Sequence, residues 1–253
     1  RACTPYGYAE AARFSEELAG AGVQIISGLA AGIDRQAHEG ALNAGGKTWA
    51  VMGCGIDECY PRENYSVYER ILETGGGIIS EYPPHTPPIA GHFPVRNRII
   101  SGLSDAVLVI EARRKSGTQI TVSFAAEQGK DVFALPGRLG DPLSEGCLEM
   151  IRDGAQVLTG TTQILECLAG KNHLSFDRTC SEGSDKYMKI NIADEDKEVY
   201  SALSNDPQRP DEITQKTGKD LTEDYLSLLR LELKGHIIQP WPGSYMLSAR
   251  RKS

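Results

Sequence analysis

Short apolar runs and helical spacing alternate along the first 170 residues of the chain. The runs are rich in β-branched residues and lie at 23–26, 48–52, 77–81, 106–110 and 131–135. Runs of this kind are typical of strands in a parallel sheet that is covered on both faces. Because a helical pattern separates each run from the next, the sequence predicts an α/β domain built on parallel strands.

The predicted helices fill the segments between these runs. They span residues 6–21, 33–44, 64–73, 94–103, 116–129, 146–153 and 161–168, and a short strand at 155–158 precedes the last of them. Asn64 is suited to cap the third helix. Crossover units alternate strand and helix, yet no strand precedes the helix at 6–21. We therefore expect that an opening strand is missing from this sequence.

The last third of the chain has a different organisation. Residues 171–190 are polar and without a period, which predicts a linker. Residues 191–253 then show three helical segments (195–203, 210–218 and 221–234) and a hairpin at 236–247, which is the order of a small winged-helix domain. The helix at 221–234 carries three acidic residues against two basic ones, Arg230 and Lys234, so its charge favours protein interaction over reading a DNA groove.

Composition limits the classes of protein to consider. The formal net charge is −7 and most of the acidic excess lies in residues 1–170, so any site for a polyanion must be local. No apolar stretch is long enough to span a membrane, and the first residues lack the apolar core of a signal peptide, which predicts a cytoplasmic protein. The six cysteines show no CxxC spacing and are interpreted as reduced thiols.

The candidate chemistry concentrates in residues 91–121. The run at 106–110 is interpreted as a central strand, and ligands of open α/β sheets bind beyond the carboxyl ends of such strands. There, Ser116 and Gly117 open a helix, whose free N–H groups favour an anion. Upstream, Arg96 and Arg98 flank Asn97 at the start of the preceding helix, and guanidinium groups can grip phosphate through paired hydrogen bonds. The alternative is that the two arginines are solvated or salt-bridged on a helix face.

A second turn, whose backbone could contact a ligand closely, follows the strand at 23–26. Gly28 and Gly32 lie in the segment SGLAAGID, but their spacing matches neither the dinucleotide fingerprint nor the phosphate loop of nucleoside triphosphatases. Structural alternatives also stay open for three polar residues. Asp34 could cap the helix that it starts, Glu111 could pair with Arg96 or Arg98, and Asn97 could satisfy loop backbone.

Five segments in order resemble the DNA-processing protein A (DprA/Smf) family. They are SGLAAGID (27–34), GCGIDECYP (53–61), FPVRNRIISGLS (93–104), EARRKSGTQIT (111–121) and FALPG (133–137). The resemblance implies an extended Rossmann-like open sheet in residues 1–170 with an appended winged helix. It also implies a homodimer that binds single-stranded DNA and loads the RecA recombinase onto it during natural transformation, without a catalytic reaction.

The resemblance and the residues together predict one DNA-binding site. Its candidate residues are Arg1, Ser27, Gly28, Gly32, Arg96, Asn97, Arg98, Lys115, Ser116, Gly117 and Thr121. We predict no cofactor, no metal site and no catalytic residue. The alternative is a nucleotide-processing enzyme, because Rossmann-like sheets also serve phosphoribohydrolases, and Glu81 or Glu111 would then be the acid.

Overall fold

The computed structural model describes residues 3–172, 192–204 and 206–247. Contacts divide the chain into two compact units, Arg1–Ser184 and Asp185–Ser253, which are described separately. Most of the segment interpreted as a linker, residues 173–190, lies outside the described residues. In the part of the chain that the structure describes, no helix is long and apolar enough to cross a membrane.

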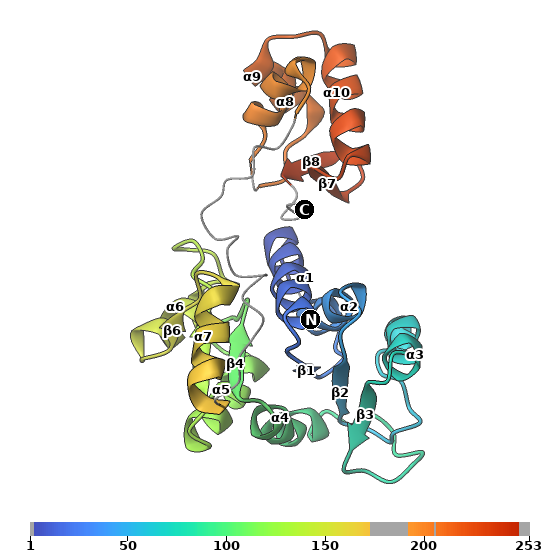
Figure 1. Cartoon of the computed structure of the whole chain (residues 1–253), viewed down its shortest axis with the longest axis vertical. Coiled ribbons are helices and arrows are strands. Elements are labelled where there is room, and N and C mark those ends of the chain that lie inside the picture. Colours follow the sequence, from blue (N-terminus) through green and yellow to red (C-terminus); the bar gives the residue numbers. More distant parts are fainter. Residues whose placement is uncertain (1–2, 173–191, 205, 248–253) are drawn as a thin grey trace. The chain divides into compact units, whose positions relative to one another are not determined.

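The first unit contains two parallel sheets of three strands each (Figure 1). One has the order β1 (Ile25–Ser27), β2 (Thr48–Met52), β3 (Gly77–Ser80), and the other has the order β4 (Ala106–Val109), β5 (Asp131–Ala134), β6 (Gln156–Val157). The parallel α/β prediction is confirmed. The prediction that the run at 106–110 is a central strand is wrong, because no described strand pairs with the outer edge of β4.

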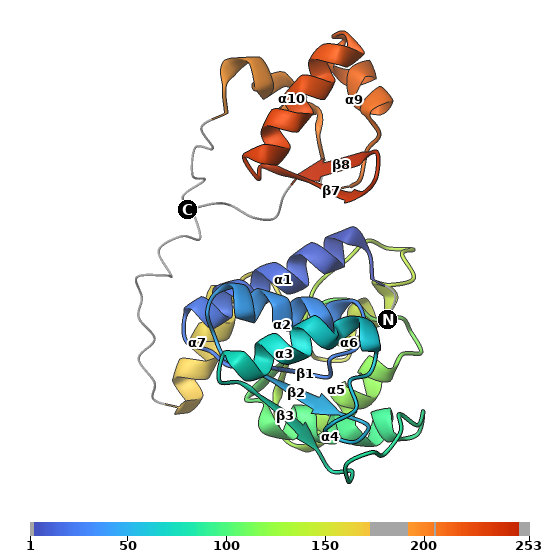
Figure 2. The ribbon, with the colours of Figure 1, turned by 90° about the vertical axis from the view of Figure 1, so that its right-hand side faces the viewer.

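Helices cover both faces of the first sheet. In Figure 2, α1 (Pro5–Gly20), α2 (Ile33–Asn43) and α3 (Tyr65–Glu73) lie on one side of β1–β3, and α4 (His92–Leu103) lies on the other. A 3-10 turn, η1 (Arg62–Asn64), precedes α3. Asn64 is the residue before α3, as predicted, but its amide donates to the carbonyl of Leu29, 2.8 Å away, instead of capping the helix. The side chain therefore ties α3 to the turn that follows β1.

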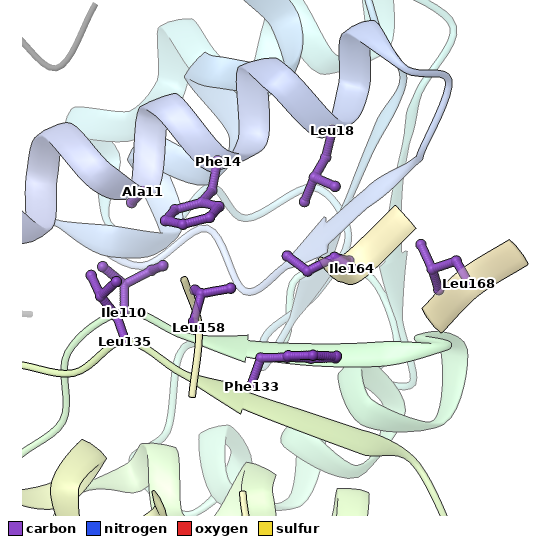
Figure 3. Packing of buried hydrophobic residues seen from close by; sticks show 9 residues of the cluster. All are labelled: Ala11, Phe14, Leu18, Ile110, Phe133, Leu135, Leu158, Ile164 and Leu168. Atoms are coloured by element: carbon purple, nitrogen blue, oxygen red, sulfur yellow. The ribbon is translucent and has the colours of Figure 1, made fainter. Parts of the chain in front are cut away.

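The second sheet is also sandwiched between helices. One face packs on α1 and α7 (Thr161–Asn172), with the buried cluster shown in Figure 3: Ala11, Phe14, Leu18, Ile110, Phe133, Leu135, Leu158, Ile164 and Leu168. The other face packs on α5 (Gly117–Glu127) and α6 (Glu145–Arg152) through Val107, Val109, Ala125, Ala134, Cys147 and Met150. Period-2 alternation along β4 and β5 sends neighbouring residues to opposite faces.

The start of α1 is fixed at the carboxyl end of β4. Thr4 caps the helix by accepting from the N–H of Gly7, 3.0 Å away, and the N–H of Thr4 donates to Glu111 Oε2 at 2.9 Å. A Cβ at Gly7 would lie 2.3 Å from the Glu111 carboxyl carbon, so only glycine allows this approach. Glu111 therefore binds Thr4 and not Arg96 or Arg98, the partners that its sequence position suggested.

The second unit has the predicted order of a winged helix. It contains the 3-10 turn η3 (Asp194–Asp196), α8 (Lys197–Ala202), α9 (Pro210–Thr217), α10 (Leu221–Leu233) and the hairpin β7 (Ile237–Trp241) and β8 (Ser244–Leu247). Arg230 of α10 donates to the buried Asp196 carboxylate at 2.6 and 2.9 Å, and Lys234 lies 3.8 Å from the same group. The two basic residues of this helix segment thus face an internal carboxylate.

Candidate nucleic-acid interface

The carboxyl ends of the strands converge on helix α4. Gly28 follows β1, Gly53 follows β2 and Glu81 follows β3, and each is contacted by a side chain of α4. Helix α4 also contacts the start of α5, where Asn97 donates from Nδ2 to the carbonyl of Gly117, 3.3 Å away. Helix α4 therefore joins the ligand edges of the two sheets.

Arg96 is the buried centre of this arrangement. Its side chain is only 5% exposed, and Nη1 donates to the carbonyl of Gly28 at 2.9 Å and to the carbonyl of Val51. Burial lowers the pKa of the guanidinium, an effect partly offset by the nearby Asp34 carboxylate. In this conformation the group is engaged with main-chain oxygens, and it holds the ends of β1 and β2 together.

The turn after β1 is built around Arg96 and Asp34. A Cβ at Gly28 would lie 2.6 to 2.7 Å from the guanidinium of Arg96, so the glycine permits the side chain to pass. The N–H groups of Gly28 and Ala30 donate to Asp34 Oδ2 at 3.1 and 3.3 Å. Gly32, the residue before α2, has φ of +88°, which glycine adopts without strain. The donors of this turn are therefore used internally by a carboxylate.

The turn before α5 is open, in contrast. Ser116 Oγ is buried and makes no hydrogen bond to any residue that the structure describes. Gly117 has no heavy atom within 4 Å of the position where a Cβ would stand. An unpartnered hydroxyl at the N-terminus of an 11-residue helix, next to a glycine with open space at its Cβ position, is suited to an anionic group. Lys115 adds an exposed positive charge to this turn.

Most of the candidate residues surround one large cavity in the first unit, of about 1290 Å³. Ser27, Gly28, Arg96, Asn97, Ser116, Gly117 and Thr121 line it, whereas Gly32, Arg98 and Lys115 do not. Arg98 turns to the end of β3 and donates to Glu81 Oε2 at 2.6 Å, with both side chains nearly half exposed. Arg1 lies outside the described residues. The structure thus brings together the turn after β1, helix α4 and the turn before α5.

Aromatic rings at the same edge were largely missed by the sequence analysis. Tyr60 and Phe93 both line the cavity, with ring centroids 5.6 Å apart, and Tyr60 is 40% exposed. Next to them, Tyr82 stacks on His92 with centroids 4.0 Å apart. Tyr60 and Tyr82 each follow a strand, in the loops after β2 and β3, and this position is the signal that could have identified them.

The two carboxylates that the enzyme alternative would use are held by other residues. The described residues contain no group of three or more His, Cys, Asp or Glu side chains that could hold a metal ion. Glu81 is paired with Arg98, and Glu111 is bound to Thr4. Burial raises the pKa of the Glu111 carboxyl, while the hydrogen bonds from Thr4 oppose this shift. Both carboxylates that the enzyme alternative requires therefore have structural partners.

Comparison with known proteins identifies the family of the chain. Residues 1–169 match the family model described as DNA recombination-mediator protein A, and residues 190–243 match the DprA winged helix domain. The Smf protein of Escherichia coli is 40% identical over 246 residues, which cover 97% of this chain and 65% of that protein. The DNA processing protein DprA of Streptococcus pneumoniae is 44% identical over 65% of this chain and 58% of its own length.

Two solved structures agree with these matches. The crystal structure of DprA from Streptococcus pneumoniae has a TM-score of 0.61 and 43% identity, over 65% of this chain and 58% of that one. DprA from Helicobacter pylori, whose structure concerns its single-stranded DNA binding mode, has a TM-score of 0.61 and 34% identity, over 67% of this chain and 77% of that one. The chain spans 65% of the length of the Smf protein of Escherichia coli. From its two matched domains, the chain belongs to the DNA recombination-mediator protein A (DprA/Smf) family.

Proposed function

We propose that the chain binds single-stranded DNA at the edge formed by α4 and the turn before α5, without breaking a bond. The observation that carries this proposal is the open turn at Ser116 and Gly117, which lies on the same cavity as the rings of Tyr60 and Phe93. Backbone donors and a hydroxyl suit a phosphate, and exposed rings suit unpaired bases. The single-stranded DNA binding of the Helicobacter pylori relative supports the same proposal.

The candidate residues that the structure describes take different roles in this proposal. Ser116, Gly117 and Lys115 contact phosphate, with Thr121 one helical turn further along α5. Asn97 fixes the turn through the Gly117 carbonyl. Arg96, Gly28, Ser27 and Gly32 shape the adjacent edge, since the Arg96 guanidinium is engaged with main-chain carbonyls. Arg98 contributes charge only when its pair with Glu81 opens.

The wider role is proposed from the family. We propose that the protein acts in the cytoplasm as a homodimer, protects the bound strand and passes it to the RecA recombinase during natural transformation. It would take no part in catalysis. The family resemblance supports this role, and a test for release of base from nucleotides distinguishes it from the phosphoribohydrolase alternative.

Fluorescence anisotropy with a labelled oligonucleotide of about 20 nucleotides, free and as a duplex, tests the binding proposal. We expect tighter binding of the single strand. We also expect the logarithm of the binding constant to fall with the logarithm of salt concentration, by about 0.7 for each phosphate contact. Lys115→Ala should reduce this slope by one contact, and Ser116→Ala should weaken binding.

The matched control is Lys47→Ala. Lys47 is exposed like Lys115, but it precedes β2 and so lies at the opposite edge of the sheet. Its removal should leave the binding constant and the salt slope unchanged. Binding that is independent of salt, or an equal loss for Lys47→Ala and Lys115→Ala, would refute the proposed site.

A further inference from the structure

Helix α10 of the second unit has two apolar faces. Leu228 and Leu231 are fully buried in the core of the unit, where the helix packs on α8, α9 and β7. Leu226, Leu229 and Leu233 point away from this core and are 52%, 43% and 85% exposed. In Figure 1, α8 and α9 lie on one side of α10 only. The second apolar face is therefore open to solvent in the described part of the unit.

The exposed leucines form a continuous row along the helix. They are spaced by three and four residues, and Thr222, four residues before Leu226, extends the row by one turn. Residues three and four apart are neighbours on a helix surface, so these side chains share one face. A row with this spacing is the surface through which two helices pack in a coiled coil. We call it the leucine seam (Thr222, Leu226, Leu229 and Leu233).

The chemistry of the leucine seam does not suit DNA, although α10 occupies the place of the helix that winged-helix proteins put into a DNA groove. Bases and phosphates are recognised by hydrogen-bonding groups and positive charges. Three of the four residues of the seam are leucines without a polar group. Arg230 beside them is held by the buried carboxylate of Asp196, 2.6 Å away. The face therefore suits another apolar helix and not a nucleic acid.

The two ends of α10 carry opposite charges beside the leucine seam. Asp220 and Glu223 are exposed at the N-terminal end. At the C-terminal end, the side chains of Arg230 and Lys234 keep 37% and 46% of their surface exposed. Glu223 and Arg230 are seven residues apart, so they lie on the same flank of the seam. A second α10 placed antiparallel would bring the acidic end of each helix to the basic end of the other.

We propose that the leucine seam pairs with the leucine seam of a second copy of this chain, with the two α10 helices antiparallel about a two-fold axis. Leu226 of one copy packs on Leu229 of the second copy, and Thr222 packs on Leu233, each contact occurring twice. Glu223 lies beside Arg230 of the second copy. This surface belongs to the second unit, so it is additional to the DNA site and independent of the homodimer proposed from the family.

The seam is short, and the pairing is correspondingly weak. α10 has 13 residues and is about 20 Å long and 10 Å wide. Such a strip is well below the roughly 800 Å² that each partner contributes to a standard interface. A covalent trap that records brief encounters is therefore a better test than the mass of the particle in solution, which the first unit also influences if it dimerises.

Disulfide trapping in the full chain is the first test. Thr222→Cys and Leu233→Cys are prepared as separate proteins and mixed in equal amounts, with copper phenanthroline as the oxidant. A disulfide requires Cα atoms within about 7 Å, which antiparallel pairing provides between the two variants. Within either variant alone, the new thiols of two paired copies are roughly 16 Å apart along the helix axis. We expect the mixture to form a cross-linked dimer and each variant alone to stay at the level of the parent chain, whose six cysteines set the background.

A second substitution separates the seam from the rest of the helix. Leu229→Glu, added to both cysteine variants, places a charge in the seam and should slow cross-linking by about tenfold or more. Leu221→Glu is the matched control, because Leu221 is 50% exposed on the same helix but lies off the seam, and it should leave the rate unchanged. Urea unfolding checks that both variants stay folded.

The mixture of Asp211→Cys with Leu233→Cys measures chance collisions, since Asp211 is exposed on α9. The proposal is overturned if the mixture of Thr222→Cys with Leu233→Cys reacts no faster than this control, which is also the result expected if a different protein covers the seam. It is equally overturned if either variant alone reacts as fast as the mixture, or if Leu229→Glu and Leu221→Glu have the same effect.

Discussion

Replacement of Arg96 and Arg98 by alanine separates an internal tie from a surface charge. Arg96→Ala removes the donor to the buried carbonyls of Gly28 and Val51, and each unsatisfied group costs about 1–3 kcal/mol. The buried guanidinium of Arg96 loses its hydration in the folded protein, and burial lowers its pKa for the same reason. Alanine does not bear this loss of hydration, which offsets part of the cost. We therefore expect a net loss of about 3 kcal/mol in the free energy of unfolding.

Arg98→Ala should cost much less. In its ion pair with Glu81, the side chain of Arg98 is 45% exposed and that of Glu81 is 44% exposed. Exposed ion pairs contribute about 0–1 kcal/mol to the free energy of unfolding. Urea unfolding followed by tryptophan fluorescence measures both variants. The chain has two tryptophans, so a Trp241→Phe background leaves Trp49 in β2 to report on the first unit alone.

A third variant separates hydrogen bonding from packing. Arg96→Met keeps an unbranched apolar stem but removes both hydrogen bonds, so we expect it to lose at least half as much stability as Arg96→Ala. Equal losses for Arg96→Ala and Arg98→Ala would refute the assignment of Arg96 as the tie between β1 and β2. So would an Arg96→Ala protein as stable as the parent.

The other predictions concern buried groups elsewhere. Burial lowers the pKa of His38 to about 4, so between pH 6.5 and 4 the imidazole stays neutral in the folded protein while it gains a proton in the unfolded one. The free energy of unfolding should therefore fall by about 1.4 kcal/mol per pH unit from pH 6.5 towards 4. Urea titrations at several pH values should show this slope, and His38→Gln should remove it. Gly40→Ala would place a Cβ 2.3 Å from the carbonyl oxygen of Ala12 and should cost about 1–3 kcal/mol in thermal melts, whereas Gly20→Ala, with nothing within 4 Å, should cost nothing. Asp196→Ala removes the buried partner of Arg230, whose own side chain is 37% exposed, and should lower stability by about 1–2 kcal/mol in urea unfolding followed by Trp241 fluorescence. The exposed Glu195→Ala is a silent control, and an unchanged stability of Asp196→Ala would contradict the pair.

The sequence by itself determined the class of fold and the place of the ligand edge. Apolar runs and helical spacing are local properties, so they located β2, β5 and α10 within a residue or two. The order of elements then implied parallel strands, whose carboxyl ends must share one edge. The residues that follow these strands, such as Gly28 and Ser116, could therefore be proposed as neighbours before any coordinates were known.

Only the tertiary structure decided what each of those residues contacts. Arg96 and Arg98 are two positions apart on one helix, yet one is buried against main-chain carbonyls and the other pairs with Glu81 in solvent. Their partners come from β1, β2 and the loop after β3, which are distant in sequence, so no local pattern encodes the choice.

The position of β4 shows the same limit. Its unbroken apolar run was interpreted as a central strand, but a run reports burial by helices on both faces and not pairing on both edges. Edge pairing depends on which strand lies next to it, and that is a property of the assembled sheet. The sequence therefore specified the strands, and the three-dimensional arrangement decided which strands pair with one another.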